Sequence, residues 1–305
     1  MSEPPEEQLV CGSLAPAAAQ AERQPGTRSR RVTADPGETE GRKSRTIVRW
    51  HTSLRAVAVV NVALWALTAA SLTSLSVGNG TTETQLLLSA AYVAGCAYRC
   101  FLPVIDIPRL VLVDSPLSSV LVGRSVATVA ELCFAAQWAL ILHHLASLSA
   151  SAFVQAVSAS LVPLILLAEG FSWYAVLTTQ QRAHAVENSL WGIAAALVVV
   201  GMLVIGTLHA AGLYWVTIAG GMAYVAFIFV YDVPMYWARW REDQASGRRY
   251  QSLADGLLDV ARRRDVSCRW SDWTNEVAWM SLYFTLGVWS SIWLVHAAAD
   301  VARNN

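Results

Sequence analysis

The charges of this chain are clumped, and the long windows between them are almost wholly apolar. Only 14% of the 305 residues are charged and 55% are hydrophobic, whereas roughly 25% of the residues in a soluble domain are charged. A helix needs about 20 apolar residues to cross a hydrocarbon core about 30 Å thick. Several windows meet that length, so the sequence predicts an all-α integral membrane protein.

Seven such windows predict a bundle of seven transmembrane helices within residues 49–305. Residues 1–48 differ, because they are rich in Pro, Gly, Ser, Glu and Arg and lack apolar periodicity. Such a segment cannot bury enough apolar surface to fold, which predicts a disordered cytoplasmic tail. The expected helices span about 53–77, 84–102, 119–146, 150–178, 185–208, 212–236 and 273–297.

The distribution of arginine predicts the orientation, since Lys and Arg concentrate in cytoplasmic connections. They precede the first helix and recur in the second, fourth and sixth connections, and the other connections have none. This pattern predicts a cytoplasmic N-terminus and an external C-terminus, and we expect the plasma (inner) membrane as the location. The residues concerned are Arg42, Lys43, Arg45, Arg49, Arg55, Arg99, Arg109, Arg124, Arg182, Arg239, Arg241, Arg248, Arg249, Arg262, Arg263, Arg264 and Arg269.

The sixth connection contains an amphipathic pattern at about 248–264. Tyr250, Leu253, Leu257, Leu258 and Ala261 recur at helical spacing, and arginines lie at both ends. This pattern is typical of a helix on the membrane surface, with its basic residues near anionic lipid headgroups. A docking site for a soluble partner is the alternative.

Charged residues inside the predicted helices lie in their cytoplasmic halves. A charge within a bilayer needs a partner or an aqueous cavity. We therefore expect Arg124 to pair with one or more carboxylates, in a polar cavity open to the cytosol or the inner leaflet with Glu131 at its floor. The predicted cluster is Arg99, Arg124, Glu131, Glu169, Glu187, Asn188 and Asp232.

Acids outnumber arginines in this cluster, and burial and mutual repulsion favour protonation of the surplus acids. Such acids suit proton relay, acid–base chemistry or cation coordination. Aromatic faces beside carboxylates favour a cation, and Trp173, Tyr174, Trp191 and Tyr231 are the expected lining. The alternative without function is an ion-pair network that only fixes helix packing.

Three classes of function fit these residues, and the third of them does not use the intramembrane cluster. The first is a carrier or binding protein for a small, cationic or amphipathic molecule, and its partners are the bilayer and that small molecule or lipid. The second is an enzyme acting on lipid at the inner leaflet, with Glu131 or Glu169 as acid or base and Arg124 or Arg99 holding a phosphate or carboxylate. The third is a scaffold that recruits a cytoplasmic partner. Carriage is favoured because no nucleophile or metal constellation stands out.

Other classes are excluded by missing residues. Equal numbers of basic and acidic residues, 22 of each, argue against nucleic acid. A retinal protein needs an intramembrane lysine, and the single lysine is Lys43 in the tail. The zinc-dependent intramembrane hydrolases use His-x-x-x-His in the last helix, which here has only one histidine. Nothing names a cofactor, and no metal is expected, although four histidines at the outer surface are weak candidates: His143, His144, His209 and His296.

Overall fold

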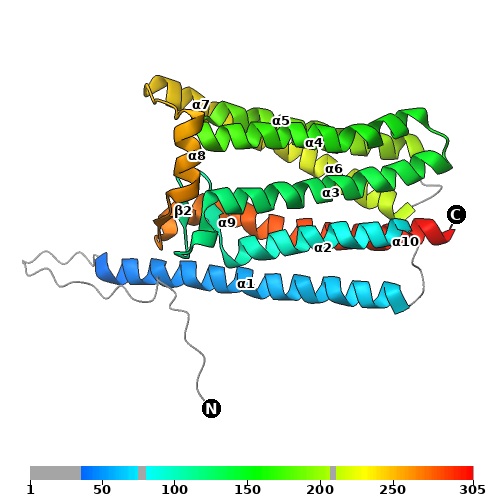
Figure 1. Ribbon diagram of the computed structural model, residues 1–305, viewed down its shortest axis with the longest axis horizontal. Coiled ribbons are helices and arrows are strands. Elements are labelled where there is room, and N and C mark those ends of the chain that lie inside the picture. The colour runs from blue at the N-terminus through cyan, green and yellow to red at the C-terminus, as the bar shows by residue number, and fades with distance from the viewer. Residues whose placement is uncertain (1–35, 75–79, 207–210, 305) are drawn as a thin grey trace, which may run out of the picture.

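The computed structural model describes residues 36–74, 80–206 and 211–304, which form a helical bundle with a small layer across one end (Figure 1). The first five helices are continuous. Two later helices each contain a π-helical turn: α6 continues through η3 into α7, and α9 continues through η4 into α10. Their bounds are α1 Pro36–Ser74, α2 Gly80–Phe101, α3 Val120–Leu148, α4 Ala152–Thr178, α5 Gln181–Ile205, α6 Ala211–Phe227, η3 Ile228–Asp232, α7 Val233–Ala245, α8 Leu253–Arg262, α9 Trp270–Leu282, η4 Tyr283–Gly287 and α10 Val288–Asn304.

Within the described residues, six helices are long and apolar enough to cross a membrane. They are Arg45–Leu72 of α1, then α3, α4, α5, the continuous helix Gly212–Ala245 and the continuous helix Trp270–Val301. The remaining long helix, α2, has 22 residues and lies between α1 and α3, but it is less apolar than the six. The prediction of a multi-pass helical membrane protein thus agrees with the structure.

Several predicted boundaries differ from the observed ones. Helix α1 begins at Pro36, so residues 36–48, expected to be disordered, are helical; residues 1–35 of the expected tail lie outside the described residues. Proline is compatible with the first turn of a helix, and the next proline after Pro36 is Pro103, beyond the end of α1. The sixth helix is longer than predicted, and the expected surface helix at 248–264 is shortened to α8.

A three-stranded sheet, absent from the sequence prediction, joins the second and sixth connections. Strands β1 (Val104–Ile105) and β2 (Leu110–Val111) form an antiparallel hairpin, and β3 (Asp265–Val266) pairs in parallel with β2. Strands of two residues are too short to show an alternating pattern, which explains why the sequence did not predict them. We call the end of the bundle that carries this sheet and α8 the α8 end.

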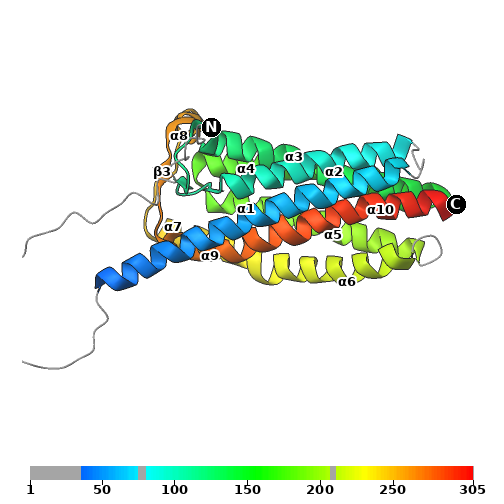
Figure 2. The same ribbon diagram turned by 90° about the horizontal axis from the view of Figure 1, so that it is seen from below.

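Helix α8 crosses this end of the bundle and packs against α3 and α4 (Figures 1 and 2). Gly256 lies so close to α4 that a Cβ atom there would be 2.0 Å from the carbonyl oxygen of Leu177. The buried side chain of Arg109 donates to Asp259 Oδ2 of α8 (2.9 Å) and to the carbonyl of Val176 in α4 (2.7 Å). One guanidinium therefore joins the hairpin, α4 and α8.

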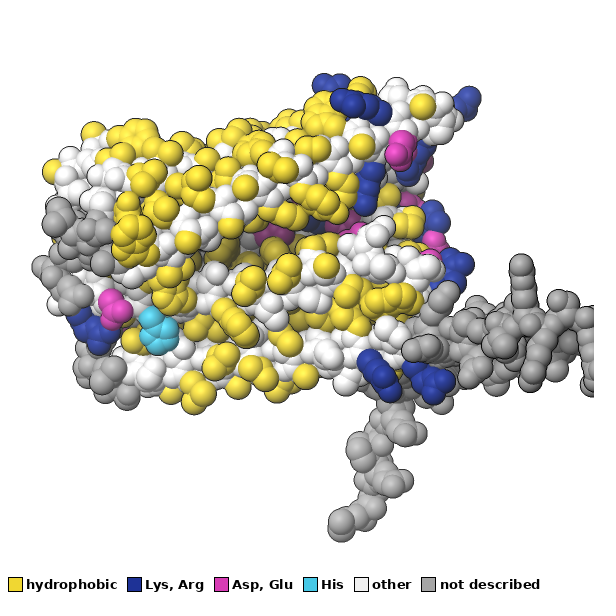
Figure 3. Space-filling model, turned by 180° about the vertical axis from the view of Figure 1, so that it is seen from behind, with side chains coloured by type: hydrophobic (Ala, Val, Ile, Leu, Met, Phe, Trp, Pro, Cys, Tyr) yellow, Lys and Arg dark blue, Asp and Glu magenta, His cyan; other side chains and the backbone are white. Residues whose placement is uncertain are grey.

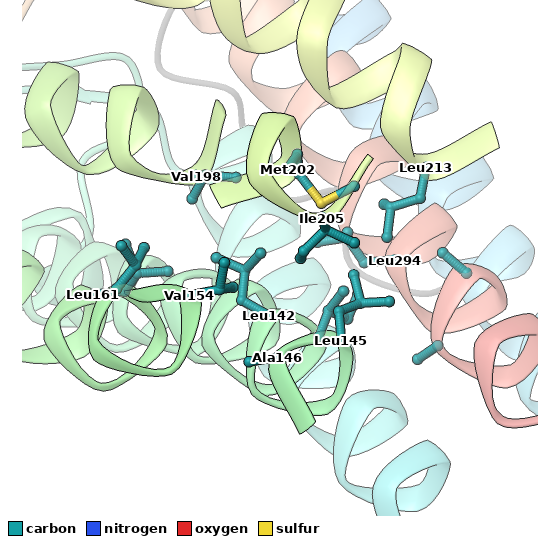
Figure 4. Packing of buried hydrophobic residues seen from close by; sticks show 14 of the residues in the cluster. Leu142, Leu145, Ala146, Val154, Leu161, Val198, Met202, Ile205, Leu213 and Leu294 are labelled. Carbon is teal, nitrogen blue, oxygen red and sulfur yellow. The ribbon is translucent and has the colours of Figure 1, made fainter. Parts of the chain in front are cut away.

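The opposite end, which we call the far end, is closed by an apolar core (Figure 4). Leu142 and Leu145 of α3 meet Met202 and Ile205 of α5. Leu213 at the start of α6 and Leu294 of α10 belong to the same cluster, whose other labelled members are Ala146, Val154, Leu161 and Val198. Helices α6 and α10 thus both contribute to the apolar core of the far end.

Polar residues of α2 are buried against neighbouring helices. Gln85 Nε2 donates to the carbonyl of Gln137 in α3 (2.8 Å), and Ser291 of α10 donates to Gln137 Oε1 (2.6 Å). Hydrogen bonds of this kind hold helices together where lipid supplies no hydrophobic driving force. The lower hydropathy of α2 reflects side chains that face the protein.

Nearer the α8 end, α6 and α7 separate from α9 and α10. Helix α6 packs mainly against α5, whereas α10 packs against α1, α2 and α3. Figure 3 shows the resulting hollow, with acidic side chains deep between two ridges of hydrophobic side chains. We call this hollow the groove.

Candidate functional site

Three carboxylates from three helices meet one arginine in the half of the bundle nearer the α8 end. The Nη2 atom of Arg124 lies 2.7 Å from Glu169 Oε2, 3.3 Å from Glu131 Oε2 and 3.5 Å from Glu187 Oε1. Arg124 and Glu131 are seven residues apart on α3 and therefore share a face. Glu169 is contributed by α4 and Glu187 by α5. The pairing expected for Arg124 is therefore present.

Neutral side chains hold the carboxylates in place. Thr128 donates to Glu169 Oε2 (2.5 Å), and Trp173 Nε1 donates to the Thr128 hydroxyl (3.0 Å). The Tyr283 hydroxyl donates to Glu131 Oε1 (3.2 Å). His184 Nδ1 lies 2.7 Å from Glu187 Oε2. Every acid of the cluster thus has a second partner that fixes its orientation.

Tyr283 reaches the cluster from η4, where the helix is π-helical. Beside this turn Val288 N–H donates to the carbonyl of Thr285, and Asn61 Nδ2 of α1 donates to the carbonyl of Phe284 (2.8 Å). The Asn61 Oδ1 atom accepts from Trp289 Nε1 (3.0 Å). Turns of this type occur frequently at functional sites. Here the turn sets the position of the phenol that contacts Glu131.

The charges of the cluster do not balance. Three carboxylates share one guanidinium, which leaves two negative charges, or one if His184 is protonated. All four charged side chains are at most 14% exposed. Buried charges of one sign must be neutralised, because desolvating an unpaired ion is very unfavourable. Protons or another cation are therefore required to neutralise the surplus negative charge of the three carboxylates.

The groove brings further acids toward the same cluster. Asp232 of η3 interacts electrostatically with Glu187 and His184, and also with Glu276 of α9 and Arg239 of α7. Asp232 and Glu276 belong to opposite walls. Aromatic side chains accompany them: Tyr236 lies 5.2 Å from the His184 ring, and Trp279 Nε1 donates to Glu276 Oε2. The walls are thus acidic and aromatic together.

A small cavity adjoins the cluster on its α2 side. It is lined by Gly95, Cys96 and Arg99 of α2, by Asp106 of the hairpin, by Arg124, Ala127, Ala130 and Glu131 of α3, and by Trp279, Tyr283 and Phe284. Arg99 donates to the carbonyls of Gly123 (3.3 Å) and Val104 (3.2 Å). Arg99 therefore faces this cavity and makes no contact with the three carboxylates on Arg124.

The structure does not bring every predicted side chain to the cluster. Asn188 Nδ2 donates to the carbonyl of His184 in its own helix (2.9 Å). Tyr174 and Tyr231 are 43% and 61% exposed and lie on the outside of the bundle, where Tyr231 stacks on Phe227. Trp191 packs against the apolar core of the far end. Of the four predicted aromatic residues, Trp173 alone is connected to the cluster.

The structure gives no contact between the described histidines among those predicted at the outer surface. His143 Nδ1 is 2.7 Å from Gln155 Nε2, and His296 Nε2 is 3.1 Å from the Thr68 hydroxyl. His144 takes part in neither of these two contacts, and His209 lies outside the described residues. Among the residues that the structure describes, no group of three His, Cys, Asp or Glu side chains is placed to hold a metal ion.

Several groups near the site carried only a weak signal in the sequence. His184 precedes Glu187 by three residues on one helix, a spacing that places both side chains together. Tyr224, Tyr236 and Tyr283 come from helices distant in sequence, so only the fold could associate them with Glu131 or Glu187.

No protein-family model matches the chain, and neither a curated protein nor a solved structure is significantly similar to it. The fold and the apolar helices nevertheless define the class of protein. This chain is a multi-pass helical integral membrane protein whose bundle contains a buried, acid-rich cluster.

Proposed function

We propose that the chain is a membrane carrier or binding protein for a small cationic or amphipathic molecule, which it holds at the acids around Arg124. The observation that carries this proposal is the convergence of Glu131, Glu169 and Glu187 on a single guanidinium. A bound cation would neutralise part of the surplus negative charge in a medium where that charge is poorly solvated.

The groove supports a ligand with an apolar part. Tyr224, Tyr236, Trp279 and Tyr283 belong to its walls, and the ring faces of such side chains attract ammonium groups. Deep between those walls lie carboxylates, which attract the charged end of a ligand. A ligand with a cationic head and a short hydrocarbon tail would match both features.

The packing also supports access from one side. At the far end Leu213 of α6 and Leu294 of α10 belong to one apolar core, whereas nearer the α8 end the two walls separate (Figures 3 and 4). A ligand entering from the α8 end would reach Asp232 and Glu276 first and Glu131 and Glu187 next. This is the arrangement expected of a carrier in an inward-open state.

The topology that we propose has seven spans, a cytoplasmic N-terminus and an external C-terminus, in the plasma (inner) membrane. Helix α2 would be the seventh span, since its 22 residues suffice for the hydrocarbon core and its polar side chains face α3 and α10. The α8 end would then be cytoplasmic. The exposed leucines of α8, Leu253, Leu257 and Leu258, would lie at the inner-leaflet surface beside Arg262 and Arg263.

A binding experiment with two ions of matched shape tests the function. Hexylammonium and hexanesulfonate are titrated by calorimetry into protein in nanodiscs. We expect hexylammonium to bind and hexanesulfonate not to bind. Glu187→Gln should weaken hexylammonium binding at least ten-fold, which is about 1.4 kcal/mol. Glu83→Gln removes an exposed acid at the opposite end of the bundle and serves as the control. Equal binding of both ions, or equal affinity of Glu187→Gln and wild type, would overturn the proposal.

Native mass spectrometry of gently solubilised protein tests the class of activity. A cationic adduct that exchanges unchanged supports carriage or binding. A resident lipid that is converted to a product would instead support the intramembrane enzyme. If the Glu131→Gln variant folds and still binds every ligand and partner that the wild type binds, the result would favour a scaffold.

Reporter fusions test the topology. A reporter that is active only in the cytoplasm should be inactive at the C-terminus and active after α7. The reverse pattern would refute the orientation, and activity at both points would show that the helix Trp270–Val301 does not cross the membrane.

A further inference from the structure

The cavity between α2, α3 and η4 shares Trp279 and Tyr283 with the wall of the groove, but the rest of its lining has a different chemistry. Its volume available to water is about 60 Å³. One water needs about 10–15 Å³, so the cavity has room for roughly four waters. It is too small for a ligand with a hydrocarbon tail.

The polar atoms around the cavity point to water as its occupant. Within the described part of the chain, Arg99 Nε, Arg124 Nε and Asp106 Oδ1 are buried and have no hydrogen-bond partner. The two arginines are more than nine-tenths buried. The lining contains donors and acceptors, and its two guanidinium groups are accompanied by two carboxyl groups, Asp106 and Glu131. Water both donates and accepts, whereas an ion of either sign would be repelled by half of this lining.

The cavity connects two acids at different depths. Asp106 belongs to the hairpin at the α8 end, and Glu131 lies on α3 beyond Arg124. Seven residues of helix separate Arg124 from Glu131, which corresponds to about 10 Å along the axis. Both acids line the same cavity, so a few waters would bridge the distance from the end of the bundle to the acid cluster.

We propose that this cavity is a hydrated proton passage from the cytoplasm to Glu131, with Asp106 as its entry residue. The Asp106 carboxylate takes a proton from solvent and passes it to a water of the cavity. The Glu131 carboxylate accepts a proton from the same chain of waters, and Asp106 returns to its charged form. One proton moves from solution to Glu131, and no bond other than O–H bonds changes. The proposal rests on the proposed function in two respects: the acid cluster exchanges protons when no other cation is bound, and the α8 end is cytoplasmic.

The charged and titratable groups that face Glu131 come from six elements: Tyr92 and Cys96 (α2), Arg124 (α3), Glu169 (α4), Glu187 (α5), Tyr224 (α6) and Tyr283 (η4). Asp106 interacts electrostatically with Arg124 and shares the cavity with Arg99. A proton on Glu131 would reduce the repulsion among the three acids that meet Arg124. Glu131 is therefore the acceptor in the proposed transfer.

A pH-jump experiment on the full-length protein in detergent tests the passage. An indicator dye in unbuffered solution reports the number of protons taken up and the rate of uptake. We expect Glu131→Gln to remove one proton per chain from the amplitude. Asp106→Asn should keep that amplitude and slow the phase at least about ten-fold. Asp114→Asn alters an exposed acid of the same connection, 3.7 Å from Arg264, and should behave as wild type.

A second variant keeps the test decisive if Asp106→Asn does not fold. Ala127→Val places two methyl groups in the cavity and should also slow uptake at constant amplitude. Unchanged rates in every folded variant would overturn the passage, since protons would then reach Glu131 through the groove. An unchanged amplitude in Glu131→Gln would also overturn it. If hexylammonium fails to bind but Asp106→Asn slows uptake, the ligand assignment fails and the passage stands.

Discussion

Replacement of Arg124 by methionine should strongly destabilise the bundle, because the arginine is the shared partner of Glu131, Glu169 and Glu187. The shortest of these contacts, 2.7 Å to Glu169, joins side chains that are 9% and 2% exposed. Removing one partner of a buried ion pair costs about 3–5 kcal/mol, since the other charge is left without compensation. We expect Arg124→Met to lower the free energy of unfolding by that amount.

A double-mutant cycle separates this interaction from the loss of packing. Glu169→Gln keeps the shape of the side chain and its acceptor for Thr128 but removes the charge. A hydrogen bond to a charged group contributes about 1.5–3 kcal/mol, so we expect the coupling energy between positions 124 and 169 to reach at least about 1.5 kcal/mol. The measurement is unfolding in sodium dodecyl sulfate, followed by helical circular dichroism.

The matched control is the pair Arg303 and Asp300 near the end of α10, whose side chains are 50% and 60% exposed. Exposed pairs contribute about 0–1 kcal/mol. The cycle of Arg303→Met and Asp300→Asn should therefore give a coupling energy within that range. If the Arg124–Glu169 coupling is no larger than this control, the cluster does not act as a buried ion-pair network and the reasoning is wrong.

Three further predictions concern other parts of the fold. Gly256→Ala should displace α8 from α4 and lower the free energy of unfolding by about 1–3 kcal/mol. The displacement should appear as faster hydrogen exchange over residues 253–262. Gly170→Ala, where a Cβ meets nothing within 4 Å, should leave this exchange unchanged. Gln137→Leu should destabilise the bundle by about 1–3 kcal/mol, measured by the same unfolding titration, because the Gln85 backbone carbonyl loses a donor and the Ser291 hydroxyl loses an acceptor. An increase in stability would contradict this account. A spin label at Leu257→Cys should be accessible to oxygen rather than to a water-soluble relaxation agent if α8 lies at the membrane surface, whereas a label at Arg248→Cys should show the opposite preference.

The sequence by itself determined the class of fold, because hydrocarbon imposes strict length and polarity requirements on a spanning helix. It also placed Glu131, Glu169 and Glu187 in the same, cytoplasmic half of the bundle, since depth follows from position along a helix. The pairing of Arg124 with one or more carboxylates was also predictable, because a buried charge requires an opposite one.

Only the tertiary structure decided which side chains meet. Helix order along the chain does not determine rotation about the helix axis, so Tyr174 and Tyr231 point outward while Tyr283 reaches Glu131. The π turns are invisible to a pattern of period 3.6, yet η4 sets the position of Tyr283. The two-residue strands and the Arg109 contacts depend on pairing between distant connections, which local sequence does not encode. Depth is a one-dimensional property of the sequence, whereas the groove and the cavity arise from the relative rotation and separation of helices.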